Sequence, residues 1–447
     1  MKRYSMNLIQ SIFALLILSG YFLLLPFYGT AAAAPAPKEL AVSLAQEPEI
    51  RVGLLTGQKK VVVSANAEFG LFDAEKRGDA KTPPKFIIKY AASTPVEITM
   101  DASGVLINGK SLGVRKLGMA LQEAPTVQGY KDYCLEVNKK PYRGELEVFP
   151  VKNDNLFTLV NILPLEQYLY GILPKEMSPD WPLETLKAQA VAARTYVMYN
   201  LRRHQADGYN VCATTDCQVY GGNETEDFRS SRAVNDTKGQ VLAYRGQLIS
   251  APFHASSGGY TEDVENVWAY HLPYLRSVED AEKNWSGARW DRKISARELT
   301  QLVEKSGQKL GKIKALELSP LHWPVTGVPD RTNSGRVKVF RLNGANGSVE
   351  LTGRKLRALL NLPSTLLDIQ VTPAGKTIAA GASHAAVQNV SSEEDIFVIN
   401  GYGRGHGVGL AQWGARLMAE KNATAGTEYF HTILHHYYQD VSIIKLY

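Results

Sequence analysis

Glu176 is the side chain in this sequence that most directly suggests acid–base chemistry. It lies in the segment Pro174-Lys175-Glu176-Met177, among apolar residues and just ahead of a helical pattern. A partly buried carboxylic acid has a raised pKa and can donate a proton near neutral pH. Cleavage of a glycosidic bond needs such a proton on the leaving oxygen. A glutamate before a helix is also a common surface or capping residue, so position alone leaves both interpretations open.

Two glycine-containing segments carry further candidates for ligand binding. Residues 253–261 (FHASSGGYT) place His254, Ser256 and Ser257 on a turn, where glycine lets the backbone approach a ligand closely. The two serines suggest binding of sugar hydroxyls, and a tight turn with hydrogen-bonding serines is the alternative. The segment lacks the G-x-S-x-G pattern of a serine nucleophile.

In residues 401–413 (GYGRGHGVGLAQW), glycine alternates with other residues around Arg404 and His406. This spacing differs from the G-x-G-x-x-G dinucleotide fingerprint. Alternation in an extended segment puts Arg404 and His406 on the same side. His406 and Gln412 are therefore candidates for a binding groove, and a purely structural glycine loop is the alternative.

The chain has three cysteines, Cys134, Cys212 and Cys217, too few for a disulfide scaffold. Cys212 and Cys217 are separated by only four residues, and we expect them to lie close together. A zinc site needs four ligands, of which these would be two. Outside the cytoplasm the pair could form a disulfide instead, and two free thiols are the third alternative.

The elements that must position these residues indicate an α+β fold. Leu183, Leu186, Ala190, Ala193 and Val197 recur at spacings of three and four, which predicts a helix. Its many alanines make it slim, so we expect it to be deeply buried.

Arg194 lies within this helix, and a charged residue there needs a partner. Glu176 or a carboxylate of the substrate would serve a substrate-binding role. A structural ion pair is the alternative.

The length of 447 residues predicts more than one domain. Residues 49–163 contain short β-branched runs and form a β-rich region, with Asn108-Gly109 as a hairpin turn. Residues 164–447 form a core of mixed sheets and helices that ends in a helical segment. Within it, the polar Ala/Gly-rich stretch 374–390 is predicted to be a flexible insert. Residues 35–48 are rich in alanine and proline and are interpreted as a linker.

The N-terminus predicts export. Lys2 and Arg3 precede an apolar run from Ile12 to Tyr28, and small residues follow. Residues 1–34 are therefore a signal peptide or an uncleaved membrane anchor, and we expect the remainder to lie outside the cytoplasmic membrane. The net charge of +6 suits a polyanionic cell wall or membrane surface and is too small to indicate nucleic-acid binding.

Four segments together resemble the stage II sporulation protein D family of peptidoglycan-acting proteins, which includes related amidase enhancers. They are 165–200 (LEQYLYGILPKEMSPDWPLETLKAQAVAARTYVMYN), 212–221 (CATTDCQVYG), 253–261 and 401–413. The resemblance covers about residues 50–447, in order. It implies that Glu176 is the general acid/base of a lytic transglycosylase, which cuts the β-1,4 bond between N-acetylmuramic acid and N-acetylglucosamine without water.

The resemblance also implies partners and a cofactor. Glycan strands would bind a groove containing His254, Ser256, Ser257, His406, Gln412 and Arg194. Some family members bind zinc near Cys212 and Cys217 with nearby histidines; here Asp216 replaces a frequent histidine, and His204 is available upstream.

Two alternatives to the enzyme stay open: a non-catalytic glycan-binding enhancer of a cell-wall amidase, or a wall-anchored scaffold protein. The partners would be peptidoglycan strands, a cell-wall amidase or sporulation wall-remodelling complex, and the cytoplasmic membrane through the N-terminal segment.

Overall fold

The computed structural model of the chain describes residues 44–78, 82–122, 133–151, 155–323, 325, 327–376, 384–424 and 426–447. The predicted export segment 1–34 and most of the predicted linker 35–48 lie outside these residues. Within the described ranges, no helix is both long and apolar enough to cross a membrane. The fold mixes helices and sheets, so the predicted α+β class is confirmed.

The first part of the chain forms two β-sheets. One has the strand order β13-β1-β12-β11-β8-β3-β4 and the other β10-β9-β2-β5-β6-β7. Side chains from both sheets, such as Val61 and Leu146, share one hydrophobic cluster. Asn108 and Gly109 have positive φ angles of 49° and 78° and form the predicted turn between β6 and β7. The strands are β1 (Glu49–Gln58), β2 (Lys60–Ala65), β3 (Phe69–Asp73), β4 (Phe86–Tyr90), β5 (Val96–Asp101), β6 (Gly104–Ile107), β7 (Lys110–Ser111), β8 (Leu117–Leu121), β9 (Leu135–Val137), β10 (Lys140–Tyr142), β11 (Glu145–Pro150), β12 (Phe157–Pro164) and β13 (Val211–Cys212).

The predicted slim helix is α2 (Leu183–Tyr199), and its alanines from Ala188 to Ala193 are fully buried. Because methyl side chains keep the helix narrow, several elements pack closely around it. The elements in contact with α2 include α1 (Leu165–Glu176), α3 (Phe228–Asp236), α7 (Gln412–Lys421), α8 (Tyr429–Tyr437) and β14 (Gln240–Tyr244). Strand β14 also pairs with β15 (Gln247–Leu248) and β25 (Ser442–Lys445).

A further part of the chain has its own hydrophobic core, which includes Leu299, Phe340 and Ile399. Within the predicted insert 374–390, residues 377–383 lie outside the described part, and Val387–Asn389 form strand β22, paired with β18. The elements are β17 (Arg289–Ser295), α5 (Ala296–Lys305), β18 (Ile313–Glu317), β19 (Val339–Gly344), β20 (Gly347–Thr352), α6 (Gly353–Leu360), β21 (Leu367–Thr372), β22 and β23 (Ile396–Tyr402).

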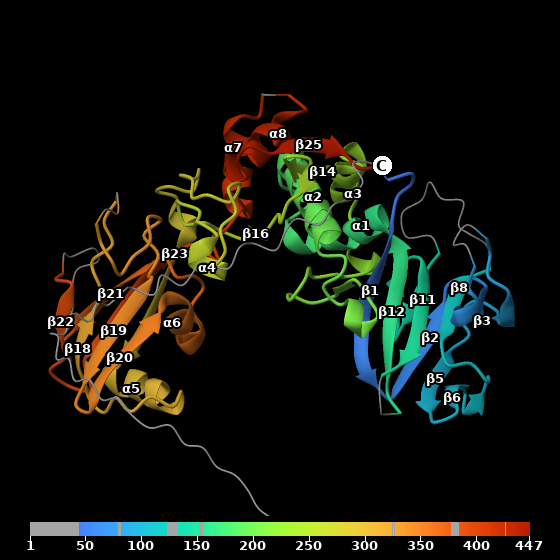
Figure 1. The fold of residues 1–447 in the computed structure, drawn as a ribbon, viewed down its shortest axis with the longest axis horizontal. Coiled ribbons are helices and arrows are strands. Elements are labelled where there is room, and N and C mark those ends of the chain that lie inside the picture. Colours follow the sequence, from blue (N-terminus) through green and yellow to red (C-terminus); the bar gives the residue numbers. More distant parts are fainter. Residues whose placement is uncertain are drawn as a thin grey trace, which may run out of the picture.

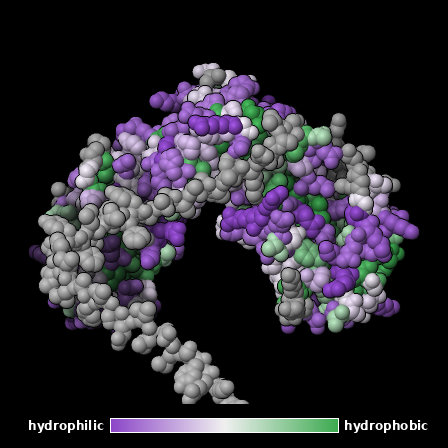
Figure 2. Space-filling model, viewed as in Figure 1, coloured by the Kyte–Doolittle hydropathy of each residue, from purple (hydrophilic) through white to green (hydrophobic). Residues whose placement is uncertain are grey.

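These three parts form an arch (Figure 1). Strands β1 to β12 make one foot, helices α1, α2, α3, α7 and α8 make the crown, and strands β17 to β23 make the other foot. Figure 2 shows an open space between the two feet. The crown therefore joins both feet and holds the sequence motifs that carry the candidate chemistry.

Candidate functional site

The two glycine-containing motifs meet in the crown. Strand β16 (Phe253–His254) pairs in parallel with β24 (Leu410–Ala411), and Ser256 and Arg404 exchange backbone hydrogen bonds of 3.0 and 2.8 Å. Gly403 has a φ of 75°, and a side chain there would lie 2.7 Å from the carbonyl oxygen of Ser256. Glycine is thus required for the close approach of the two backbones.

A cleft of about 900 Å³ lies against these paired motifs. Its walls come from the end of α1, from α2, from the cysteine-containing loop and from the β16 and β24 motifs. Lining residues include Glu176, Cys217, His254, Trp268, His406 and Gln412. Segments far apart in the sequence therefore build one concave site.

Glu176 is the last residue of α1, which continues through Pro174. Its side chain is half-buried in the cleft wall, and Nε2 of Gln412 donates a hydrogen bond to Oε2 at 3.3 Å. Burial raises the pKa of Glu176, although hydrogen bonds from Gln412 and the Val219 backbone partly oppose this. The negative end of the helix dipole also disfavours the carboxylate. The environment suits a carboxyl group that must hold a proton at a higher pH than usual.

His254 and His406 are neutral groups of the same cleft. Burial lowers the pKa of His254 well below its usual range. Burial, together with the nearby guanidinium of Arg336, lowers the pKa of His406 to about 4. Nδ1 of His254 lies 3.1 Å from the carbonyl oxygen of Val408, and Nδ1 of His406 accepts from the Val408 N–H at 3.1 Å. Within the described residues Nε2 of His254 has no hydrogen-bond partner, whereas His406 bonds to the backbone of both Val408 and Phe253.

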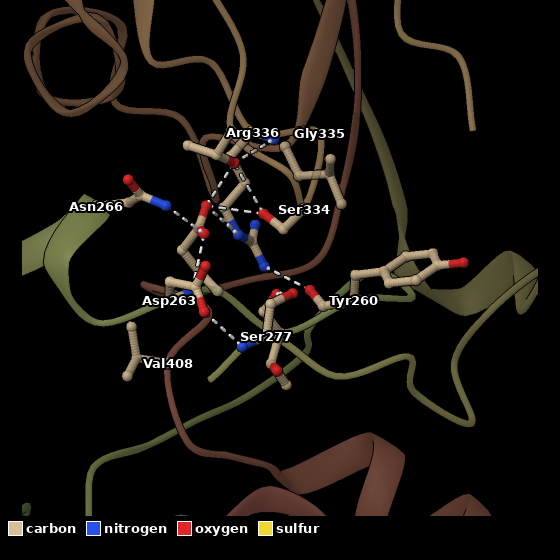
Figure 3. A network of polar contacts seen from close by, with 12 residues as sticks. Tyr260, Asp263, Asn266, Ser277, Ser334, Gly335, Arg336 and Val408 are labelled. Atoms are coloured by element: carbon tan, nitrogen blue, oxygen red, sulfur yellow. Dashed lines mark hydrogen bonds and ion pairs between the residues drawn. The ribbon is translucent and has the colours of Figure 1, made fainter. Parts of the chain in front are cut away.

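A buried polar network supports the glycine loop from behind (Figure 3). Arg336 donates from Nη2 to the carbonyl oxygen of Tyr260 at 3.1 Å, and also to that of Ser257 at 2.9 Å. Glu262 accepts hydrogen bonds from Thr332 and Ser334, and its backbone N–H donates to the Gly407 carbonyl oxygen at 2.8 Å. A side chain on Gly407 would overlap the Arg336 guanidinium. Sequence reasoning missed this network, because its members come from separate segments without a motif.

Four potential metal ligands lie together on the loop beside the cleft. The ligand atoms of His204, Cys212, Asp216 and Cys217 all lie within 4.8 Å of one another. This confirms that the two cysteines are close, and both thiols are free. Parallel pairing of β13 with β1 holds Cys212 in place.

The pKa values of the groups in this cluster are shifted in different directions. Burial raises the pKa of the Cys217 thiol to about 12, and the neighbouring Cys212 adds to the effect. Burial also acts to raise the pKa of Asp216, but Arg203 and His204 outweigh it and the net pKa is lowered. Two sulfurs, one imidazole and one carboxylate form a donor set that fits tetrahedral zinc.

Comparison with known proteins bears on this site directly. The family model described as Stage II sporulation protein matches residues 153–244, which contain Glu176 and the cysteine loop. Stage II sporulation protein D of Bacillus subtilis is 31% identical over 301 residues, covering 64% of this chain and 75% of the relative. The chain belongs to the stage II sporulation protein D family.

Other relatives of this family member extend the comparison. An uncharacterised protein of Brachyspira hyodysenteriae is 31% identical over 359 residues, 80% of this chain and 84% of the relative. The amidase enhancer of Bacillus subtilis is 31% identical over 293 residues, but the match spans only 40% of that protein. Residues 274–409 match a domain of unknown function.

In this family member, three predicted site residues have other partners. Arg194 is fully buried and forms a two-pronged ion pair with Glu166, at 3.0 and 2.6 Å. Arg194 therefore forms the structural ion pair that was the alternative in the sequence analysis. The prediction that Arg194 binds the substrate was wrong.

Ser256 and Ser257 are likewise buried and do not line the cleft. The Ser256 hydroxyl donates to Glu282, which also accepts from the Ser257 N–H at 2.9 Å. Burial and the nearby Asp280 raise the pKa of Glu282 to about 7. The two serines thus fix the turn that carries His254, and the prediction that they contact the substrate was wrong. Nothing in the sequence around Glu282 signalled this role.

Proposed function

We propose that this family member is a lytic transglycosylase that cleaves the β-1,4 bond between N-acetylmuramic acid and N-acetylglucosamine. The observation that carries the proposal is the raised pKa of Glu176 in the wall of a cleft. A raised pKa lets a carboxyl group keep its proton to a higher pH, as a general acid must.

In the proposed reaction, protonated Glu176 gives its proton to the glycosidic oxygen as the C1–O bond breaks. The resulting carboxylate then takes the proton of the muramic 6-hydroxyl as that oxygen bonds to C1. The products are a free 4-hydroxyl and a 1,6-anhydro end, and Glu176 regains its proton, so no water is consumed. Gln412 and the Val219 N–H would hold the carboxyl group through both steps.

Besides Glu176, one carboxyl group lines the cleft within the described residues, and its contacts support a mechanism with a single catalytic carboxyl. Glycoside hydrolases generally use two carboxyl groups, either to activate water or to form a covalent intermediate. Asp216 also lines the cleft, but Arg203 donates to it at 2.7 Å and His204 lies 3.3 Å away. Its carboxylate is thus committed to the potential metal cluster. An attacking hydroxyl supplied by the substrate removes the need for a second catalytic carboxyl.

Replacement of Glu176 tests the proposal. Glu176→Gln keeps the size of the side chain but cannot transfer a proton, so cleavage of purified glycan strands should fall by at least about 10²–10⁴-fold. Glu350→Gln is the matched control, because Glu350 lies on β20 and pairs with Arg341 at the surface. Circular dichroism checks the fold of both variants. Wild-type cleavage by Glu176→Gln would exclude the assigned role.

A second candidate function is enhancement of a cell-wall amidase, favoured by the 31% identity to the amidase enhancer of Bacillus subtilis. In that role the cleft would bind glycan without cutting it. Glu176→Gln would then leave stimulation of a purified amidase unchanged, because binding needs shape and not a proton. Stimulation without any glycan cleavage by the wild-type protein would favour this function.

We also propose that His204, Cys212, Asp216 and Cys217 hold a zinc ion. Four protein ligands make a closed site, which is typical of structural zinc. When bound, zinc would tie the cysteine loop to the segment after α2. The same loop leads to Val219, whose N–H donates a hydrogen bond to Glu176. A well-ordered loop would therefore help to hold the Glu176 carboxyl group in position.

Finally, we propose that the protein acts outside the cytoplasmic membrane, attached to the membrane or free in the wall. The basic, apolar and small-residue pattern of residues 1–34 supports this, as do relatives named for sporulation and amidase enhancement. A reporter that functions only in the cytoplasm, fused after Tyr447, should be inactive. Strong reporter activity would contradict the proposed location.

A further inference from the structure

Three of the six tryptophans meet in one row, although they come from distant segments. Trp181 lies between α1 and α2, Trp285 follows Glu282, and Trp413 lies in the first turn of α7. The ring centroids of Trp181 and Trp413 are 4.8 Å apart, as are those of Trp285 and Trp413. Arg416, one helical turn after Trp413, lies over the rings of Trp413 at 4.9 Å and Trp181 at 5.2 Å.

Core packing does not account for this tryptophan row. All three side chains are partly exposed. Only Trp181 packs against one of the hydrophobic clusters found among the described residues; Trp285 and Trp413 belong to none. Large aromatic surfaces that gather outside a core commonly mark a binding site.

The row adjoins the cleft that holds Glu176. Trp413 directly follows Gln412, the residue that donates to Glu176. The backbone N–H of Trp413 donates to the carbonyl oxygen of Ala255 at 3.0 Å, and Ala255 lines the cleft. A polymer lying in the cleft and leaving it past Gln412 would reach the indole rings next.

We propose that Trp181, Trp285 and Trp413, with Arg416, form a platform for the part of a glycan strand beyond the bond that is cut. This rests on the proposed function for the identity of the polymer. The C–H face of a sugar ring is apolar and stacks on an indole ring, which buries apolar area from both.

Arg416 adds a polar component to the platform. Its Nε donates to Glu420 at 2.6 Å, and no partner is found for its two Nη groups within the described parts of the chain. Guanidinium groups bind carboxylates and hydroxyls through such N–H pairs. The platform therefore suits a chain of sugars that carries acidic substituents, as muramic acid residues do.

Binding measurements that do not depend on cleavage test the platform. In a Glu176→Gln background, Trp285→Leu and Trp413→Leu should each weaken binding to purified long glycan strands by about tenfold, as expected for the loss of one stacked ring. Trp413→Phe should retain most of the affinity, because it keeps an aromatic face. All three should bind a single disaccharide unit as the background does. Tyr133→Leu is the control, since Tyr133 is 50% exposed and lies in the β-rich foot.

The outcomes separate the platform from the proposed catalysis. Equal affinity of the Leu variants and the background for long strands, with unchanged melting temperatures, would overturn the platform. Loss of amidase stimulation with unchanged glycan binding would also overturn it, because the row would then bind a protein. If Trp→Leu and Trp→Phe weaken binding equally, stacking is excluded. Failure of the wild-type protein to cleave would refute the proposed activity and leave these binding results intact.

Discussion

The buried ion pair between Arg194 and Glu166 predicts a large and specific effect on stability. Arg194 has no exposed surface and donates four hydrogen bonds: two to Glu166, one to the Gln240 carbonyl oxygen at 3.0 Å and one to the Val234 carbonyl oxygen at 3.2 Å. Arg194→Leu would leave the Glu166 carboxylate buried, and its remaining donors among the described residues are neutral, the Gly239 N–H and the Tyr447 hydroxyl. Removing one member of a buried pair costs about 3–5 kcal/mol, and we expect about 4 kcal/mol here.

Denaturant unfolding of Arg194→Leu, Glu166→Leu and the double variant measures this loss. The double variant should be destabilised by less than the sum of the single changes, because it leaves no unpaired charge. Arg194→Lys keeps the charge and serves if Arg194→Leu does not fold, with an intermediate loss of stability. The folded fraction of each variant should bind glycan normally. An unchanged free energy of unfolding together with lost glycan binding would refute the structural role and restore Arg194 to the substrate site.

Three further predictions concern the metal cluster and the glycine loop. The zinc content of the purified wild-type protein should be near one ion per chain and should fall strongly in Asp216→Ala. A chelator should lower the melting temperature of the wild type but not that of Asp216→Ala. A wild-type protein without bound metal would contradict the proposed zinc site. The folded protein raises the pKa of Glu282 from the ordinary value of 4.5 to about 7. The protonated side chain therefore stabilises the fold at acidic pH, and this contribution is lost as the pH rises through about 7. The melting temperature should therefore decline between about pH 5 and about pH 8, less steeply in Glu282→Gln, and equal slopes would count against this assignment. Gly407→Ala should lower stability by about 1–3 kcal/mol, because its φ of 87° and its contact with Arg336 exclude a side chain; a neutral effect would mean that the loop is not held as described.

Local patterns predicted the elements of this fold well. The spacing of Leu183, Leu186 and Ala190 identified α2, and its alanines indicated its burial, because helix periodicity and side-chain size are local properties. Asn108-Gly109 identified a hairpin turn for the same reason. The two cysteines were correctly expected to lie close together, since four residues cannot separate them far.

Partners from distant segments could not be predicted in this way. Glu166 lies on a different helix from Arg194, and only the packing of α1 on α2 brings them together. His204 was expected as an available zinc ligand, but only the folded structure shows its ring within 4.8 Å of the ligand atoms of Cys212, Asp216 and Cys217. Glu282 holds Ser256 from across a long loop, so the serines looked free to bind sugar. Each of these errors concerns which long-range contact satisfies a polar group.

The masses of the strand ends test the central claim most directly. Purified glycan strands, digested with the wild-type protein, should yield new ends that are lighter by one water than reducing ends, which identifies the 1,6-anhydro product. Glu176→Gln should yield none. New reducing ends would show that water is the nucleophile and contradict the single-carboxyl mechanism. Absence of any new end, with amidase stimulation retained, would contradict the enzyme and support the enhancer.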